Sequence, residues 1–268
     1  MFRAFVLATS LALASAGMAT AQDAGRSNLE SAQAAKDRGD FAEAVRLWRM
    51  AADQGDADGQ EELGLSYLFG QGVPENAAEA VRWFRMAADQ GNASAQYLLG
   101  LMYARGRGVP QNAAEAVRWY RMAADQGNAG AQDNLGVMYQ NGRGVPQNNA
   151  EAVRWYRMAA DQGYAEAQNN LGLMYEHGRG VPQNDAEAVR WYRMAADQGL
   201  ARGQDNLGFM YENGRGVPQN YAEAYKWYAL SAAQGFTNAV TYRDRVLVKM
   251  TPAQIAEGQR LAAAWRPR

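Results

Sequence analysis

Side chains that could carry catalysis or bind a metal are few in this sequence of 268 residues. There is no cysteine and one histidine, His177, so we expect neither a zinc site nor a histidine-based catalytic triad. An acidic cluster at Asp53, Asp56 and Asp58 lacks the glycine and terminal glutamate of a calcium loop. The residue types therefore predict no catalytic residue, no cofactor and no metal site, and so a protein that is not an enzyme.

A glycine-rich stretch, Gly106-Arg107-Gly108, recurs along the chain and could suggest a phosphate loop. It follows a predicted helix instead of a strand, lacks the lysine of such a loop and leads into Val109-Pro110, so we interpret it as a structural loop. The favoured role of the arginines is to cap carbonyls at a helix C-terminus, and an anion-binding edge stays open as the alternative. These arginines form a row with one member in each of the last four copies: Arg107, Arg143, Arg179 and Arg215.

Aromatic and methionine residues recur with the same period. Trp119-Tyr120 and its copies, flanked by arginine, could stack on nucleic-acid bases. The tyrosine falls on an apolar helix face, however, and the arginines are spaced for pairs with acidic residues on the helix surface, so packing between neighbouring copies explains them better. We assign two methionine rows to core packing as well. The rows are Met102, Met138, Met174, Met210 and Met86, Met122, Met158, Met194.

These residues recur because the chain repeats one 36-residue unit, which is clearest over residues 92–127. Apolar residues between Ala95 and Tyr103 follow helical spacing, and Gly106 predicts the end of that first helix. Asn112, with Glu115 three residues later, predicts a second helix that begins with a capping box. We expect five full copies, over residues 56–91, 92–127, 128–163, 164–199 and 200–235.

Glycine also stands inside the predicted first helix of each copy, where it costs about 1 kcal/mol relative to alanine. We expect these glycines to mark a close approach of two helices, with Ala116 and Ala123 and their copies as the facing residues. The glycines are Gly64, Gly100, Gly136, Gly172 and Gly208.

The segments outside the five copies predict a signal peptide and two caps. Residues 1–21 combine Arg3, an apolar run and the small residues Ala19-Thr20-Ala21, which is typical of a cleavable export signal. We expect a periplasmic or secreted protein with no lipid-bearing cysteine and no membrane insertion after cleavage. Residues 22–55 predict an N-terminal capping hairpin, and residues 236–268 predict C-terminal capping helices.

The pattern AxxLGxxYxxGxGVxxNxxEAxxWYxxAAxQG, present over residues 56–235, resembles Sel1-like repeats, which are relatives of tetratricopeptide repeats with a longer loop. The ending MTPAQIAEGQRLAAAW also resembles the tail of exported bacterial members. The resemblance implies an all-α fold, a right-handed α/α superhelical solenoid whose first helices line a concave side, and a role as an adaptor or scaffold. Some cysteine-rich secreted members have been linked to penicillin binding or hydrolysis. That β-lactamase-like alternative is disfavoured, because the chain has no cysteine.

Alignment with the tetratricopeptide core places one asparagine in the concave groove in each of the last three copies: Asn134, Asn170 and Asn206. In related tetratricopeptide solenoids such a row clamps the backbone of an extended peptide, and an amide has the donor and the acceptor that this requires. The alternative is that these asparagines are only solvated, and both interpretations stay open. The other candidate groove residues are Asp133, Asn169, Asp205, Gln140, Glu176, Glu212 and His177.

The predicted groove has more acidic than basic residues. Its acidic members are Asp133, Glu166, Glu176, Asp205 and Glu212, whereas only Arg105 and Arg202 are basic. We therefore expect the partner to be a protein or peptide with a neutral to basic segment. Nucleic acid is not expected as a partner, because the whole chain has a formal net charge of -1 and offers no basic surface in bulk.

Overall fold

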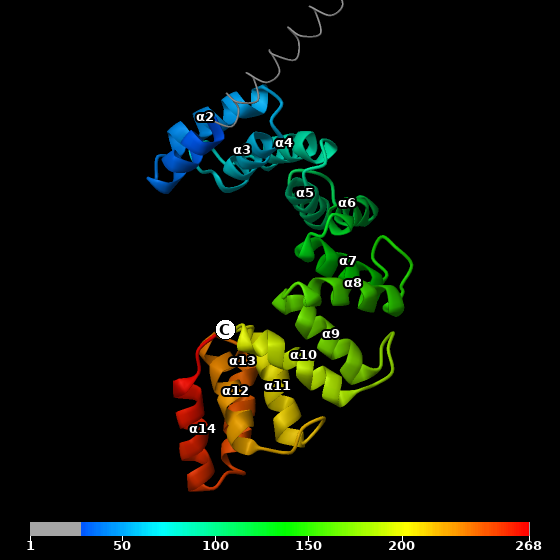
Figure 1. Cartoon of the computed structure of the whole chain (residues 1–268), viewed down its shortest axis with the longest axis vertical. Coiled ribbons are helices and arrows are strands. Elements are labelled where there is room, and N and C mark those ends of the chain that lie inside the picture. The colour runs from blue at the N-terminus through cyan, green and yellow to red at the C-terminus, as the bar shows by residue number, and fades with distance from the viewer. Residues whose placement is uncertain (1–27, 268) are drawn as a thin grey trace, which may run out of the picture. The chain divides into compact units, whose positions relative to one another are not determined.

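The computed structural model describes residues 28–267, and all regular structure in that range is helical (Figure 1). The predicted export signal, residues 1–21, lies outside the described residues. A helical segment over residues 28–37 comes first. It is followed by α2 (Phe41–Asp53), α3 (Ala57–Phe69), α4 (Ala77–Asp89), α5 (Ala93–Arg105), α6 (Ala113–Asp125), α7 (Ala129–Asn141), α8 (Asn149–Asp161), α9 (Ala165–His177), α10 (Asp185–Asp197), α11 (Ala201–Asn213), α12 (Tyr221–Ala233), α13 (Thr237–Leu247) and α14 (Pro252–Ala264).

The described helices form two compact units, divided after Gln126. In the first unit, each helix from α2 to α6 packs against the next along the chain. In the second unit, consecutive helices from α7 to α12 do the same, and α12 contacts both α13 and α14 (Figure 1). Each unit is thus a stack of helix hairpins, the packing of an all-α solenoid. Between residues 28 and 267, no helix has the length and apolar character needed to cross a membrane.

Helix ends lie where the sequence predicts them. The side chain of Asn112 accepts hydrogen bonds from the backbone N–H groups of Ala114 and Glu115, both at 3.1 Å. Gly106 adopts a left-handed conformation with φ 69° at the end of α5. The glutamate does not complete the expected capping box. Its side chain instead forms an ion pair with the arginine three residues later, as in Glu151–Arg154 at 3.2 Å. A capping box is present at α14, between Thr251 and Gln254.

The glycines inside the first helices make room for an aromatic ring of the second helix. A Cβ atom on Gly172 would lie 2.6 Å from the ring of Tyr192, and one on Gly136 would lie equally close to the ring of Tyr156. The expectation that alanines face these glycines is therefore wrong. A flat ring fills the space beside the glycine, and the alanine copies of Ala116 and Ala123 are buried elsewhere in the helix contact.

The second glycine of each loop is required for stacking of successive copies. Gly108 has φ +72°, and a Cβ there would overlap the backbone oxygen of Ala77 at the start of α4. Gly216 approaches Asp185 in the same way in the second unit. The glycine-rich stretch is therefore a structural loop, as the sequence predicts.

The two methionine rows have different environments. Met102, Met138, Met174 and Met210 are buried at 4% exposure or less, which confirms the core assignment. Met86, Met122, Met158 and Met194 are 37–41% exposed, so the core assignment of this row is wrong. Met158 shares its helix stripe with Glu151 and Arg154, and this stripe of α8 faces solvent.

A buried glutamine in every first helix connects the helices of neighbouring hairpins. In the second unit, the Nε2 of Gln168 donates to the backbone oxygen of Ala160 at 3.2 Å, and its Oε1 accepts from Gln198 at 2.8 Å. Gln60, Gln96, Gln132 and Gln204 are similarly buried, at 1% exposure or less. Both polar ends of the Gln168 amide are thus satisfied inside the stack.

Candidate binding site on the first-helix face

Every residue of the predicted groove site lies on a first helix of the second unit, α7, α9 or α11. Helix α9 also contacts α11 directly, so the first helices line one face of this unit. Two depressions open on that face. The first, of about 370 Å³, lies over α7, α9 and the start of α11 and includes Asp133, Asn169 and Asn170. The second, of about 260 Å³, lies over α9 and α11 and includes Glu176, His177, Asp205 and Asn206.

Two asparagines of the predicted ladder are hydrogen-bonded sideways to the preceding first helix. The Nδ2 of Asn170 donates to Asp133 Oδ1 at 2.9 Å, and the Nδ2 of Asn206 donates to Asn169 Oδ1 at 2.8 Å. Both asparagines are half-buried, so they are not simply solvated surface residues. In the described part of the chain their Oδ1 atoms accept no hydrogen bond, which leaves each amide with a fixed orientation and an unused acceptor.

The third ladder residue, Asn134, is half-buried and makes no side-chain hydrogen bond within residues 28–267. His177 is exposed in the last turn of α9, at the rim of the second depression. Neither is held by a partner in the way that Asn170 and Asn206 are.

Asp133 and Asp205 occupy equivalent positions on α7 and α11, and neither carboxylate has a cationic hydrogen-bond partner within residues 28–267. Burial, together with the negative charge of Glu166, raises the pKa of Asp133 to about 6 despite the hydrogen bond from Asn170. The side chain is 8% exposed. Burial also raises the pKa of Asp205 to about 6, against the opposing charge of Arg245. Its Oδ1 is buried and has no hydrogen-bond partner among the described residues.

The missing partner of Asp205 has a simple origin in the repeat. The position that holds Asn170 and Asn206 in α9 and α11 corresponds to Tyr242 in α13, which departs from the repeat sequence. Tyr242 lines the second depression beside Asp205. The series of sideways hydrogen bonds therefore stops at Asp205.

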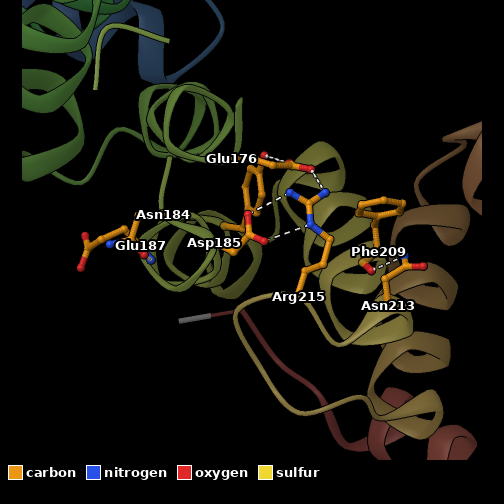
Figure 2. Close-up of polar contacts among 8 residues, drawn as sticks. Glu176, Asn184, Asp185, Glu187, Phe209, Asn213 and Arg215 are labelled. Carbon is orange, nitrogen blue, oxygen red and sulfur yellow. Dashed lines mark hydrogen bonds and ion pairs between the residues drawn. The ribbon is translucent and has the colours of Figure 1, made fainter. Parts of the chain in front are cut away.

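Glu176 belongs to a different kind of carboxylate, one held by hydrogen bonds from both a tyrosine and an arginine (Figure 2). Its Oε2 accepts from the Tyr192 hydroxyl at 2.6 Å, and its Oε1 accepts from Arg215 at 2.8 Å. The guanidinium of Arg215 also pairs with Asp185 at 2.8 Å and lies 5.7 Å from the ring of Phe209. The hydrogen bond from Arg215 lowers the pKa of Asp185.

Glu212 repeats this arrangement one copy later. It accepts a 3.0 Å hydrogen bond from the Tyr228 hydroxyl and pairs with Arg245 and, at 2.9 Å, with Lys249. Burial alone would raise the pKa of Glu212, but the hydrogen bonds from Arg245, Lys249 and Tyr228 outweigh it and the pKa is lowered. One copy before Glu176 the same position is Gln140, whose Oε1 accepts from the Tyr156 hydroxyl at 2.7 Å.

The charge of the face therefore differs from the sequence-based count. Glu176 and Glu212 are largely neutralised by Arg215, Arg245 and Lys249, none of which the sequence places at this face. Glu212 and Gln140 point into the stack and line neither depression. A constant spacing of 16 residues from Gln140, Glu176 and Glu212 to a tyrosine is the sequence signal that identifies this buried layer.

Two of the four loop arginines, Arg107 and Arg215, have identifiable partners. Arg107 donates to the backbone oxygen of Leu68 at 2.9 Å and pairs with Glu75 at 2.8 Å. The arginine thus caps a helix C-terminus, as expected, but that helix belongs to the preceding copy. Among the residues that the structure describes, no three histidine, aspartate or glutamate side chains converge as metal ligands.

Comparison with known proteins agrees with this architecture. The Sel1 repeat family model matches residues 35–56, 57–92, 93–128, 129–164, 165–200 and 201–236. A Sel1 repeat protein from Oxalobacter formigenes has a similar structure, with 32% identity and a TM-score of 0.78 over 88% of this chain and 96% of the other. No match was found among curated proteins.

A protective antigen of uropathogenic Escherichia coli strains, described as displaying an SLR fold, is similar as well. It shares 37% identity with a TM-score of 0.79, over 89% of this chain. The chain spans about half of that antigen, 53% of its length. Sel1 repeats generally mediate protein–protein interaction. The repeated helix hairpins, the six matched segments and these two structures together show that the chain belongs to the Sel1-repeat family.

Proposed function

We propose that the chain is a non-enzymatic scaffold that binds a partner protein through an extended segment laid across α7, α9 and α11. The observation that carries this proposal is the sideways bonding of Asn170 and Asn206. Each amide is held in place by the preceding first helix, and its Oδ1 is left available. A preorganised amide loses little conformational freedom on binding, which favours affinity.

The orientation of these amides defines what they recognise. One N–H of each Nδ2 already donates within the stack, whereas Oδ1 is the unused acceptor of the amide and can accept hydrogen bonds from N–H groups of a ligand. A row of such acceptors matches the backbone N–H groups of an extended peptide without reading its side chains. Asn134 supplies a third amide at the equivalent position of α7.

The charges on this face favour a neutral to basic segment. Asp133, Glu166 and Asp205 contribute negative charge, and no arginine or lysine in the described part of the chain forms a hydrogen bond with them. Arg202 and Arg245 lie in the same depressions and limit the net charge. Binding should therefore weaken moderately with added salt.

We also propose that the scaffold acts outside the cytoplasm, in the periplasm or as a secreted protein. The support for this is the sequence of residues 1–21, with its positive start, apolar run and small residues at the cleavage position. N-terminal sequencing of the protein purified from cell envelopes should begin at Gln22; a chain that still begins at Met1 would contradict the proposed export.

The function is tested by changing Asn134, Asn170 and Asn206 together to alanine and measuring capture of the partner by affinity purification. We expect loss of at least tenfold in recovered partner. The matched control changes Asn141 and Asn213 to alanine, because these exposed amides lie on α7 and α11 but bond to their own helix backbone. Full capture by the folded triple variant, checked by circular dichroism, would refute the role of the ladder.

A further inference from the structure

Along the first-helix face, acidic and neutral residues alternate at one repeat position, although the repeat consensus does not require this. Three equivalent positions, one on each of α7, α9 and α11, hold Asp133, Asn169 and Asp205. Asn169 accepts the same sideways hydrogen bond as Asp133, at nearly the same distance, so an amide is sufficient for the structural role. The carboxylates at the two flanking positions therefore need another explanation.

On the basis of the proposed function, we propose that the bound segment carries two basic side chains, lysine or arginine, about six residues apart, one recognised by Asp133 and the other by Asp205. The two carboxylates lie in separate depressions on the same face, with the neutral Asn169 position between them. The proposal specifies the partner chemistry that the ladder alone leaves open.

Each depression is built for a long side chain with a charged end. Around Asp205, the walls are formed by Leu173, Phe209 and Tyr242, which can cover the alkyl stem of lysine or arginine. Phe209 is 37% exposed and supplies an aromatic face to a cation. The Oδ1 of Asp205 has no hydrogen-bond partner in the described chain, so this carboxylate is the group in the depression that still lacks one.

The other charged groups near Asp205 are already engaged. Glu176 is paired with Arg215 at 2.8 Å, and Arg245 is paired with Glu212. In the depression at Asp133, Val137 and Leu200 form the apolar walls, and Glu166 adds a second negative charge opposite Arg202. Both depressions therefore retain an unneutralised carboxylate beside apolar surface.

The distance between the two sites sets the spacing in the partner. Packed helices lie about 8–10 Å apart, so α7 and α11, separated by α9, place the two carboxylates roughly 16–20 Å apart. An extended chain advances about 3.3 Å per residue, which corresponds to about five to six residues. Side chains of an extended chain alternate between faces, so an even spacing of about six directs both basic groups toward the protein.

The inference is tested by selecting peptides from a displayed library of random 12-residue sequences on the immobilised full chain. We expect the selected sequences to be enriched in pairs of lysine or arginine at a spacing of about six. Replacing either basic residue of a selected peptide by glutamine should weaken binding about tenfold in fluorescence anisotropy. Enrichment without such pairs, or at unrelated spacings, would overturn the inference.

Two further variants of the full chain separate this inference from the proposed function. The first is a double variant, Asp133→Asn with Asp205→Asn, which places at both positions the residue that α9 already has at position 169. This variant should fold normally. It should remove the preference for basic pairs while ladder-dependent binding of peptides persists. If selected peptides lack basic pairs but lose binding to the triple asparagine variant, the two-site inference fails and the proposed function stands. If no sequence is enriched over bare support, both fail.

Discussion

Two junctions in the second unit are built from the same repeat yet differ in charge. Between α9 and α11, Arg215 bridges Glu176 and Asp185 (Figure 2). Between α7 and α9, the equivalent of Arg215 is Arg179, which is exposed and makes no ion pair within residues 28–267. The positions that would attract it are Gln140 and Asn149, and the Oδ1 of Asn149 is buried without a hydrogen-bond partner in the described chain. At these two junctions the arginine thus forms ion pairs only where the residues at the two contacting positions are acidic.

The same contrast divides the carboxylates of the first-helix face. Glu212 meets Arg245 and Lys249, and its pKa is lowered, whereas Asp133 meets a neutral amide and its pKa is raised to about 6. Carboxylates of the first kind hold copies together. Those of the second kind are unfavourable for folding at neutral pH, which is a common property of residues retained for binding.

The largest effect is expected at a contact that is the same in both copies, between the two helices of each hairpin. Gly136→Leu and Gly172→Leu should each destabilise the protein by about 3 kcal/mol, because the new side chain overlaps the ring of Tyr156 or Tyr192. Urea unfolding should give similar midpoints for the two variants. Unchanged midpoints would show that the ring and the glycine do not pack as described.

The next effect should differ between the junctions. Arg215→Met leaves Glu176, which is 8% exposed, without its cation and should destabilise by about 2 kcal/mol. Arg179→Met removes an exposed arginine that makes no ion pair with the described residues, and it should change stability by less than about 0.5 kcal/mol. The pair is compared by urea unfolding at one pH and one salt concentration. Equal losses would mean that the charge difference between the junctions has no energetic consequence.

The pH dependence distinguishes the two kinds of carboxylate. The folded-state pKa of Asp133, about 6, lies above the ordinary value of about 3.9, so the folded protein binds more protons than the unfolded chain between these values. Stability from this group is therefore greatest below about pH 4 and falls as the pH rises to about 6.

Asp133→Asn should raise the free energy of unfolding by roughly 2 kcal/mol at pH 7.5 and leave it nearly unchanged at pH 4. The effect of Asp205→Asn should be smaller, because Asp205 is more exposed and faces Arg245. Thermal or urea unfolding at the two pH values measures both variants. A loss of stability at pH 7.5 would contradict the assignment of a raised pKa.

The smallest effect is expected when the two acidic residues of the α9–α11 junction are introduced at the equivalent positions of the α7–α9 junction. Gln140→Glu combined with Asn149→Asp should draw Arg179 into an ion pair, with a coupling energy of about 0.5–1 kcal/mol in a double-mutant cycle with Arg179→Met. The equivalent cycle at Arg215 provides the reference value. No coupling at position 179 would show that features other than charge separate the two junctions.

Local signals predict most of the fold from sequence. These signals each act within one helix, and the observed helix bounds agree with them. They are the N-cap Asn112, the left-handed C-cap Gly106 and the apolar spacing of α5. The prediction that the methionine row containing Met158 lies in the core is wrong, because the helical period does not distinguish the edge of an apolar stripe from the adjacent solvent-facing stripe. The approach of Tyr192 to Gly172 was missed for another reason, since it depends on the depth at which two helices pack.

The candidate face was predictable in outline and not in its charges. The repeat register placed Asp133, Asn170 and Asp205 on the first helices, because equivalent positions have equivalent directions. It could not place Arg245, since α13 departs from the repeat, or show that Arg215 reaches across to Glu176 in the preceding copy. The hydrogen bond of Asn170 to Asp133 was also unpredicted, because the sequence gives the two positions but not their contact.

The most direct test of binding at the first-helix face is photo-crosslinking in intact cells from two positions in parallel. A photoreactive residue at position 170 lies among the predicted groove residues. The comparison probe, at position 158, replaces Met158, which is 39% exposed on the solvent-facing stripe of α8. The account predicts a discrete crosslinked product from position 170 that disappears when Asn134 and Asn206 are changed to alanine, and little product from position 158. A product of equal or greater yield from position 158, insensitive to the two asparagines, would contradict the account.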